Sequence, residues 1–243
     1  RNQMARALVR QGVALNKKGR FDESLAVYID CVKRFGNDTT AMVRDQVATA
    51  LLNQGITLQQ IGRIDESLTA YVECARRFSS DDAPVPREKV VVALSCQGVV
   101  LGLMGRFEES MTVYVECVNR FGDGINLTAP DSVALVLVNQ GTMLMQMGRY
   151  EESLVAFGEC VDRFGDSTAP STSNLVAGAL YSQGLALGEM GRSEESIAAH
   201  FAFLDRSSDA IIPALRDYVA SAQVCVLQQS LTLWKSSLSM DWL

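Results

Sequence analysis

One motif recurs through most of this chain at a constant spacing. The segment QGVALNKKGRFDESLAVYIDCVKRF, residues 11–35, returns three times in similar form and once more in a divergent copy. The copies begin at positions 11, 54, 97, 140 and 183, so each follows the previous one by 43 residues without insertion or deletion. A fixed period between about 20 and 50 residues is typical of solenoids, whose repeats pack only on their neighbours. The period therefore predicts one elongated array.

Each repeat has the apolar spacing of two consecutive helices, here called helix A and helix B. In the second repeat, apolar residues follow a helical period as far as Gly62, and a second helical period starts after Asp65. We expect about 18–22 residues in each helix A and about 13 in each helix B. In repeats one, three and four, helix B should end at a Phe-Gly pair, with the glycine in the C′ position. The predicted repeats cover about residues 1–36, 37–79, 80–122, 123–165 and 166–208.

The end of the chain departs from the repeat. Leu227 stands where the next mid-helix glycine would fall, and Trp234 stands where the next corner glycine would fall. A helix pair of the usual kind is therefore not expected, and about residues 213–237 should form one capping helix, as solenoid ends require. The sequence thus predicts an all-α fold, a right-handed α-solenoid of five helix-turn-helix repeats plus a C-terminal capping helix, forming a single domain over residues 1–243.

Three positions recur in every repeat and carry the packing hypothesis. Glycine in the middle of a helix costs about 1 kcal/mol relative to alanine, so its recurrence indicates that helix B crosses helix A there with no room for a side chain. The preceding glutamine is expected to form a ladder of side chains along the array, bonded to one another or to backbone, with ligand contact as the alternative. The corner arginine is expected to pair with acids of a neighbouring repeat. The glycines are Gly12, Gly55, Gly98, Gly141 and Gly184; the glutamines are Gln11, Gln54, Gln97, Gln140 and Gln183; the arginines are Arg20, Arg63, Arg106, Arg149 and Arg192.

The sequence offers no support for an enzyme. The single histidine, His200, occupies the aromatic position of the fifth repeat and is interpreted as structural. Four cysteines recur at the repeat period, so they should lie about 8–10 Å apart, too far for disulfides and without metal-ligand spacing. No glycine-rich phosphate loop is present. We therefore expect no catalytic residue, no metal site and no cofactor.

Charge and hydropathy limit the partners and the location. The net charge is −6 and no basic stripe is visible, so nucleic acid is not expected as a partner. There is no apolar run of about 18 residues, so we expect no membrane span. Cysteines that are buried and reduced favour a cytoplasmic location. The chain starts at Arg1, inside an expected helix, which motivates the alternative that it is part of a larger protein.

The first repeat carries a family resemblance. Large apolar residues, glycines, small residues and an aromatic fall on the expected offsets at Leu8, Gly12, Leu15, Gly19, Ser24, Tyr28 and Cys31. The chain in this respect resembles tetratricopeptide repeats, in the long-period form of bacterial arrays and kinesin-light-chain-like proteins, over about residues 4–207. It departs from their pattern where Ser24 and Cys31 replace alanines, Leu8 replaces tryptophan and Gly36 replaces proline. HEAT or armadillo repeats are the alternative.

The resemblance implies that helices A line a concave, mostly aliphatic groove that binds a protein or peptide. The lysine and asparagine clamp that some relatives use for a carboxylate is absent, because Val13 and Ile56 stand at the asparagine position. The groove residues implied by the family offsets are Thr49, Leu52, Ile56, Gln60, Val92, Ser95, Val99, Leu103, Leu135, Val138, Thr142, Gln146, Tyr181 and Leu185. The competing interpretation is that the long A helices bury these side chains against one another.

The expected function is a non-catalytic scaffold for protein–protein interaction, binding a peptide, helix or protein in this apolar groove. Because the repeats are nearly identical, head-to-tail stacking into homo-oligomers or filaments is one form that the interaction could take. The alternative is a regulatory or sensor region of a larger enzyme or signalling protein.

Overall fold

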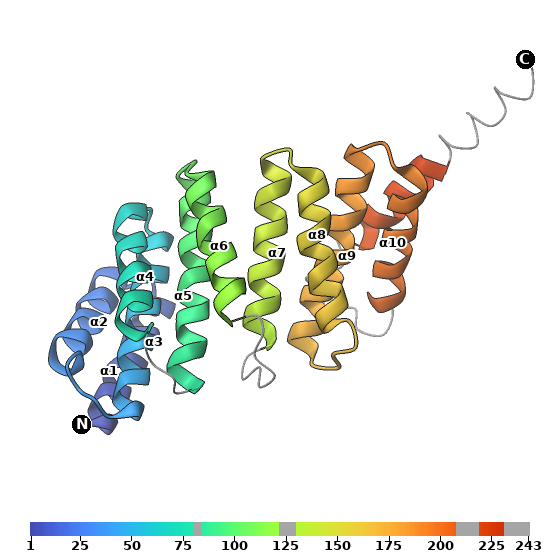
Figure 1. The fold of residues 1–243 in the computed structure, drawn as a ribbon. Coiled ribbons are helices and arrows are strands. Elements are labelled where there is room, and N and C mark those ends of the chain that lie inside the picture. The colour runs from blue at the N-terminus through green and yellow to red at the C-terminus, as the bar shows by residue number, and fades with distance from the viewer. Residues whose placement is uncertain (80–83, 122–129, 208–218, 231–243) are drawn as a thin grey trace, which may run out of the picture. The chain divides into compact units, whose positions relative to one another are not determined.

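The computed structural model describes residues 1–79, 84–121, 130–207 and 219–230 of the chain, and these residues form helices without any strand (Figure 1). The A helices are α1 (Asn2–Lys17), α3 (Ala41–Gln60), α5 (Pro84–Leu103), α7 (Pro130–Gln146) and α9 (Pro170–Glu189). The B helices are α2 (Phe21–Phe35), α4 (Ile64–Phe78), α6 (Phe107–Phe121), α8 (Tyr150–Phe164) and α10 (Ser193–Ser207). Each B helix is 15 residues long, slightly longer than expected.

The chain divides into two compact units, an N-terminal unit of Arg1–Val136 and a C-terminal unit of Leu137–Leu243, with the boundary inside α7. In the N-terminal unit each helix from α1 to α6 contacts the next, and α3 also contacts both α1 and α5. In the C-terminal unit α9 contacts α8 and α10. Packing of each helix on its sequence neighbours confirms the predicted all-α solenoid. A single domain over the whole chain stays a prediction.

The corner between helices A and B depends on a glycine with a left-handed backbone. All five corner glycines have φ between 71° and 77°, a conformation that favours glycine because it has no Cβ. At the first corner, the N–H of Arg20 bonds to the carbonyl of Leu15 at 3.0 Å, which closes the end of α1. The glycines that follow helix B differ from expectation. Gly36 and Gly165 have φ of −58° and −56°, so they end their helices in a right-handed conformation.

Close packing of helices A and B occurs at the mid-helix glycines. A Cβ added to Gly55 would lie 2.5 Å from Tyr71, and one added to Gly184 would lie 2.6 Å from the ring of His200. The other three glycines contact Tyr28, Tyr114 and Phe157 in the same manner. A serine early in helix B strengthens this crossing in repeats one, three and five, since its Oγ donates to the glycine carbonyl at 2.6–2.8 Å. The glycine therefore sets the distance between the two helices.

The corner arginines do not pair in the way the sequence analysis expected. Each bonds to the glutamate three residues further along its own helix B, as in Arg63–Glu66 and Arg149–Glu152. Arg192 also forms an ion pair with the preceding repeat, to Glu151 at 3.5 Å, as the sequence analysis expected. Residues three apart are neighbours on a helix surface, so the local partner is easier to reach than one on the adjacent repeat.

A different arginine joins consecutive repeats. Arg206, in the last turn of α10, donates from Nη1 to the carbonyl of Gly165 at the end of α8, at 2.6 Å. Arg120 donates in the same way to the carbonyl of Ser79 after α4. Carbonyls at the end of a helix lack intrahelical partners and carry partial negative charge, so a cation from the next repeat satisfies them.

Residues 219–230 form a further helix that packs on the last repeat. Ala222 is fully buried in a cluster with Ala177 of α9 and Phe203 of α10. Gln229 donates from Nε2 to Oγ of Ser196 at 2.9 Å. This part of the predicted capping helix therefore covers the fifth repeat, and Leu227, at the position of the missing glycine, is 70% exposed. The remaining residues of the predicted helix, 213–218 and 231–237, lie outside the described residues.

Candidate functional site

The predicted groove residues on the A helices differ widely in exposure. The buried ones are Leu52 and Ser95; the half-buried ones are Thr49, Val92, Val99, Leu135, Val138, Tyr181 and Leu185; the exposed ones are Ile56, Gln60, Leu103, Thr142 and Gln146. The exposed residues lie toward the C-terminal ends of their helices, and the buried ones lie nearer the middle. Leu52 and Ser95 therefore belong to the core and do not line an open surface, which corrects the prediction for these two residues.

In the N-terminal unit, α3 and α5 expose aliphatic side chains near their C-terminal ends. Ile56 is 40% exposed and Leu103 is 67% exposed, and Val99 is half-buried on the same helix as Leu103. On the same part of α3, Gln60 accepts a hydrogen bond from Asn16 of α1 at 2.9 Å. We call Ile56, Val99 and Leu103 the A-face patch.

In the C-terminal unit, one predicted groove residue, Tyr181, packs against aromatic rings of the next helix. Tyr181 of α9 lies with its ring centroid 5.7 Å from that of His200 and 5.4 Å from that of Phe203, both on α10. Such edge and tilted arrangements are those that aromatic rings favour in a packed interior. The other members of the predicted set in this unit are exposed or half-buried, and they are Val138, Thr142, Gln146 and Leu185.

The recurrent glutamines do not form the expected ladder. Gln11 is exposed, the other four are half-buried, and none of the five bonds to another within the residues that the structure describes. Gln54 instead lies in a groove that the sequence analysis missed, between the B helices α2 and α4 and above α3. The recurrence of glutamine in the sequence could have pointed to this groove, but sequence spacing does not show which neighbouring helices flank the side chain.

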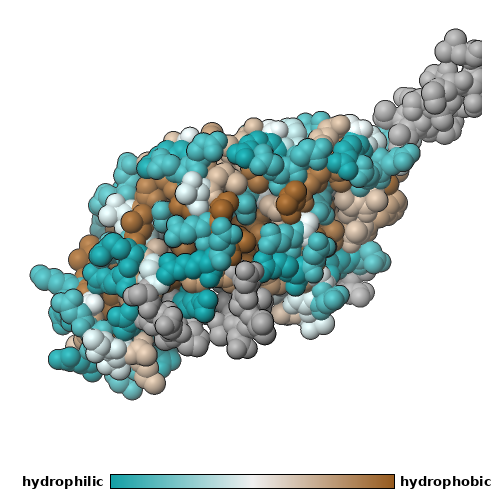
Figure 2. Space-filling model, viewed as in Figure 1, coloured by the Kyte–Doolittle hydropathy of each residue, from teal (hydrophilic) through white to brown (hydrophobic). Residues whose placement is uncertain are grey.

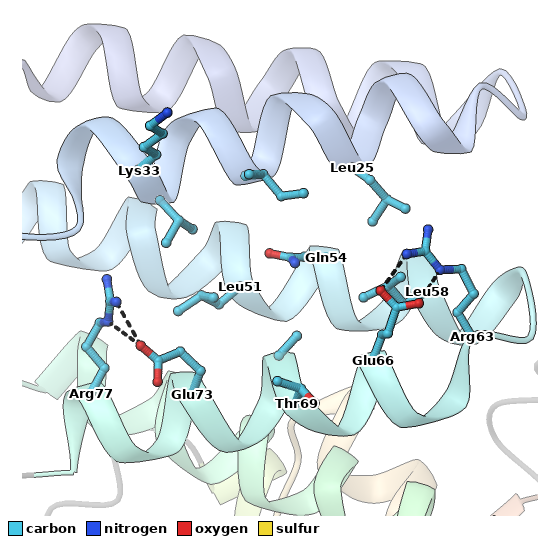
Figure 3. Close-up of a pocket in the computed structure, with 13 residues that line it drawn as sticks. Leu25, Lys33, Leu51, Gln54, Leu58, Arg63, Glu66, Thr69, Glu73 and Arg77 are labelled. Carbon is cyan, nitrogen blue, oxygen red and sulfur yellow. Dashed lines mark hydrogen bonds and ion pairs between the residues drawn. The ribbon is translucent and has the colours of Figure 1, made fainter.

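This groove, which we call the B-face groove, has a volume of about 470 Å³ and a mainly apolar floor (Figure 3). Leu25, Leu58 and Ala70 form a packed cluster in the floor, and Leu51 lies one helical turn before Gln54 on α3. Ile29 of α2 lies on its edge and is 51% exposed. On the face seen in Figure 2, apolar surface is likewise visible between hydrophilic side chains. The groove therefore offers solvent-accessible apolar contacts around one central amide.

Charged side chains occupy both ends of the B-face groove. At one end, two nitrogens of Arg63 hold both carboxylate oxygens of Glu66, and the hydrogen bond from Arg63 lowers the pKa of Glu66 below its ordinary value. At the other end, Arg77 bonds to Glu73 at 2.7 Å. Burial pulls the pKa of Glu73 upward, but hydrogen bonds from Arg76 and Arg77 lower it overall. Lys33 lies at this second end and has no ion pair among the described residues.

Metal ligands and thiols can be assessed only in the described residues. They contain no group of three histidine, cysteine or carboxylate side chains arranged to hold a metal ion. The four cysteines at the repeat period are free and buried, and burial raises the pKa of Cys74 and of Cys117 to about 12, so both thiols are protonated at neutral pH. Within the described ranges, none of the helices has the length and apolar content needed to cross a membrane.

Comparison with known proteins gives a family match in the first repeat and a similarity of fold over most of the chain. The family model described as tetratricopeptide repeat matches residues 5–38. A search of curated proteins finds no significant match. The match in the first repeat, with the structural similarities below, favours tetratricopeptide repeats over the HEAT or armadillo alternative.

Three solved structures illustrate the similarity of fold. BtubC (BKLC) from P. vanneervenii has a TM-score of 0.65 at 13% identity, covering 98% of this chain and 93% of its own. A putative kinesin light chain from Podospora anserina with nearly identical TPR-like repeats has a TM-score of 0.64 at 10% identity, covering 86% and 96%. PlcR from Bacillus thuringiensis, solved with the peptide PapR7 and DNA, has a TM-score of 0.61 at 11% identity, covering 92% and 74%. At these identities the similarity shows the fold alone.

Proposed function

We propose that this chain, a tetratricopeptide repeat protein in its repeats and in its fold, is a non-catalytic scaffold that binds a protein partner through the A-face patch. The observation that carries the proposal is the exposure of Ile56 and Leu103, at 40% and 67% of their surface. These side chains lie on helices α3 and α5, which contact each other, and apolar surface shared by neighbouring helices supports an interaction site. The partner would place an apolar helix or segment against this patch.

The chemistry of the surface limits the proposed partner. The chain has a net charge of −6, which supports a protein partner and gives no attraction for nucleic acid. Four buried free thiols at the repeat period support a reducing, cytoplasmic location. If the chain is the regulatory or sensor region of a larger enzyme or signalling protein, the same patch would hold the target or the catalytic region of that protein.

Changing Leu103 to aspartate should abolish partner capture and leave stability nearly unchanged. Because Leu103 is mostly exposed, the aspartate carboxylate would be hydrated in the free chain. In the complex it would be buried against an apolar surface without water. We expect binding at least about 10-fold weaker, equivalent to about 1.4 kcal/mol. The measurement is affinity capture with the purified chain, followed by direct titration of the captured protein.

Val155 supplies the matched control for this test. It is a large aliphatic residue on helix B of the fourth repeat, 71% exposed, and lies outside the A-face patch. Val155→Asp should leave capture intact, while Ile56→Asp should act like Leu103→Asp. Equal capture by Leu103→Asp and the unchanged chain would show that the partner binds elsewhere.

Self-assembly is a second form of the proposed function, supported by the exposed face of α1. Met4, Ala7, Gln11 and Ala14 are exposed, although the residues 43 positions later in α3 include the buried Val47, Ala50 and Thr57. In α3 this face is covered by the preceding B helix, α2. A second copy that covers the exposed face of α1 would bury the same apolar positions that every later repeat buries.

Met4→Glu should reduce any self-association and leave the fold intact, because Met4 is 55% exposed in the single chain. The measurement is mass in solution by light scattering over a concentration series, with Val115→Glu, at a 43% exposed position on α6, as the control. We expect a mass that rises with concentration for the unchanged chain and for Val115→Glu, but less for Met4→Glu. A constant mass of 26.5 kDa for all three would eliminate self-assembly.

A further inference from the structure

We propose that the B-face groove is a second binding site, which holds an extended peptide segment with apolar side chains and a carboxylate placed against Lys33. The groove lies between α2 and α4 above α3, and Gln54 lies near its centre (Figure 3). Its occupant would be a segment of another protein, recognised by its backbone, its apolar residues and one negative charge.

The B-face groove is separate from the A-face patch. Gln54 and Ile56 are two residues apart on α3, and consecutive residues of an α-helix are rotated by about 100°, so their side chains point about 200° apart. Gln54 lines the groove, whereas Ile56 does not. Occupation of one surface therefore leaves the other open, and a variant in one should not alter binding at the other.

The central amide favours an extended occupant over a helix. Gln54 has no hydrogen bond to any residue that the structure describes, and its side chain offers both donors and an acceptor. The peptide groups of a bound helix are satisfied within the helix, whereas an extended chain still needs partners for its N–H and C=O groups. An extended segment can therefore use the Gln54 amide, as well as the accessible apolar surface of Ile29, which is 51% exposed and lines the groove.

The charged side chains at the two ends of the groove indicate which charge the occupant should carry. Of the charged side chains that line the groove, Glu66 and Glu73 are each held by an arginine, so their charge is already compensated. Lys33 is exposed and adds a cation without an ion pair in the described part of the chain. The lining thus has one uncompensated positive charge, which a single carboxylate of the occupant would complement.

The length of the groove sets the length of the segment. Arg63, which precedes α4, and Arg77 near its end are 14 residue steps apart, which corresponds to about 21 Å at 1.5 Å per residue. An extended chain advances about 3.3 Å per residue, so about six residues reach from one charged end to the other. Alternate side chains of such a segment point in the same direction, so about three of them would face the apolar floor.

The test uses the full chain and a positional-scanning library of N-acetylated, C-terminally amidated octapeptides, with binding measured by fluorescence polarisation. We expect selection of Leu, Ile or Val at alternate positions and of Asp or Glu near one end. Lys33→Glu should reverse the charge preference to Lys or Arg and weaken the best acidic peptide at least about 10-fold. Gln54→Leu should weaken it too, and N-methylation of one central peptide group should have the same effect.

Two controls separate this site from the fold and from the A-face patch. Lys17→Glu changes an equally exposed lysine at the end of α1, outside the groove, and should leave the peptide preference unchanged. Leu103→Asp should not alter peptide binding, so the groove and the A-face patch can fail independently. The proposal is overturned if no peptide is selected, if Lys33→Glu keeps the acidic preference, or if the bound peptides become helical by circular dichroism.

Discussion

Replacing Gly184 with leucine should destabilise the C-terminal unit by about 3 kcal/mol, because overpacking of this size forces helices apart. Even a Cβ at Gly184 would lie 2.6 Å from the ring of His200, and leucine adds three further carbons at that point. The carbonyl of Gly184 also accepts the hydrogen bond from Ser196 at 2.6 Å, so a shift of α10 would weaken that bond as well.

Gly178 provides a matched control on the same helix. A Cβ added there meets no atom within 4 Å, so Gly178→Leu should stabilise the helix by up to about 1 kcal/mol through helix propensity alone. The measurement is urea unfolding followed by circular dichroism, with hydrogen exchange of α10 as a local readout. Equal stability of the two variants would show that helices A and B do not approach each other as closely as the structure indicates.

The second large effect concerns His200, which fills the aromatic position of the fifth repeat without a hydrogen-bond partner for either ring nitrogen among the described residues. Phenylalanine fills the corresponding position in the fourth repeat, as Phe157. His200→Phe should therefore stabilise the chain by about 1–3 kcal/mol at pH 7, because it removes buried polar atoms that lack partners.

This gain should increase as the pH falls. Burial lowers the pKa of His200 in the folded chain below its ordinary value near 6.5. Below that pH the unfolded chain binds a proton that the folded chain does not, so stability falls by up to about 1.4 kcal/mol per pH unit until the folded pKa is reached. The contribution of neutral His200 is thus complete above about pH 6.5 and is lost below it.

Chemical unfolding at pH 7.5 and pH 5.5 measures this effect as the difference between His200→Phe and the unchanged chain, in which the titration of shared carboxylates cancels. We expect the difference to be larger at pH 5.5. The converse variant, Phe157→His, should be less stable than the unchanged chain and should become more sensitive to acid. A difference that is independent of pH would mean that the folded chain protonates His200 as easily as the unfolded chain does.

The sequence was sufficient to predict the helices, because each depends on local chemistry that the repeat shows five times. The corner glycine at Gly62, for example, ends helix A in the structure as expected, and Pro170 opens α9 at a first-turn position where its missing N–H has no consequence. The close approach at Gly55 was also inferable, because only a packing constraint explains a recurrent glycine within a helix.

The surfaces were harder to predict, because a 43-residue period identifies equivalent residues but not the rotation of each helix against its neighbours. Leu52 and Ile56 both lie on family offsets for a groove, yet Leu52 is 6% exposed and Ile56 is 40% exposed. The sequence shows that Gln54 is a recurrent amide, but its position between α2 and α4 depends on how the helices pack. Arg63 could reach several acids, and the nearest on its own helix is its partner.

The arginine contacts between repeats have a consequence for how such a gene changes. Arg120 to Ser79 and Arg206 to Gly165 both join residues 41 positions apart, each linking one B helix to the next. Unequal recombination that removes or inserts one whole period of 43 residues would place an arginine beside an equivalent carbonyl at the end of the preceding B helix. The contact between the two repeats is then preserved. Loss of a few codons between an arginine and its carbonyl would instead change their separation and break that contact, so selection should tolerate length variation chiefly in whole-repeat steps.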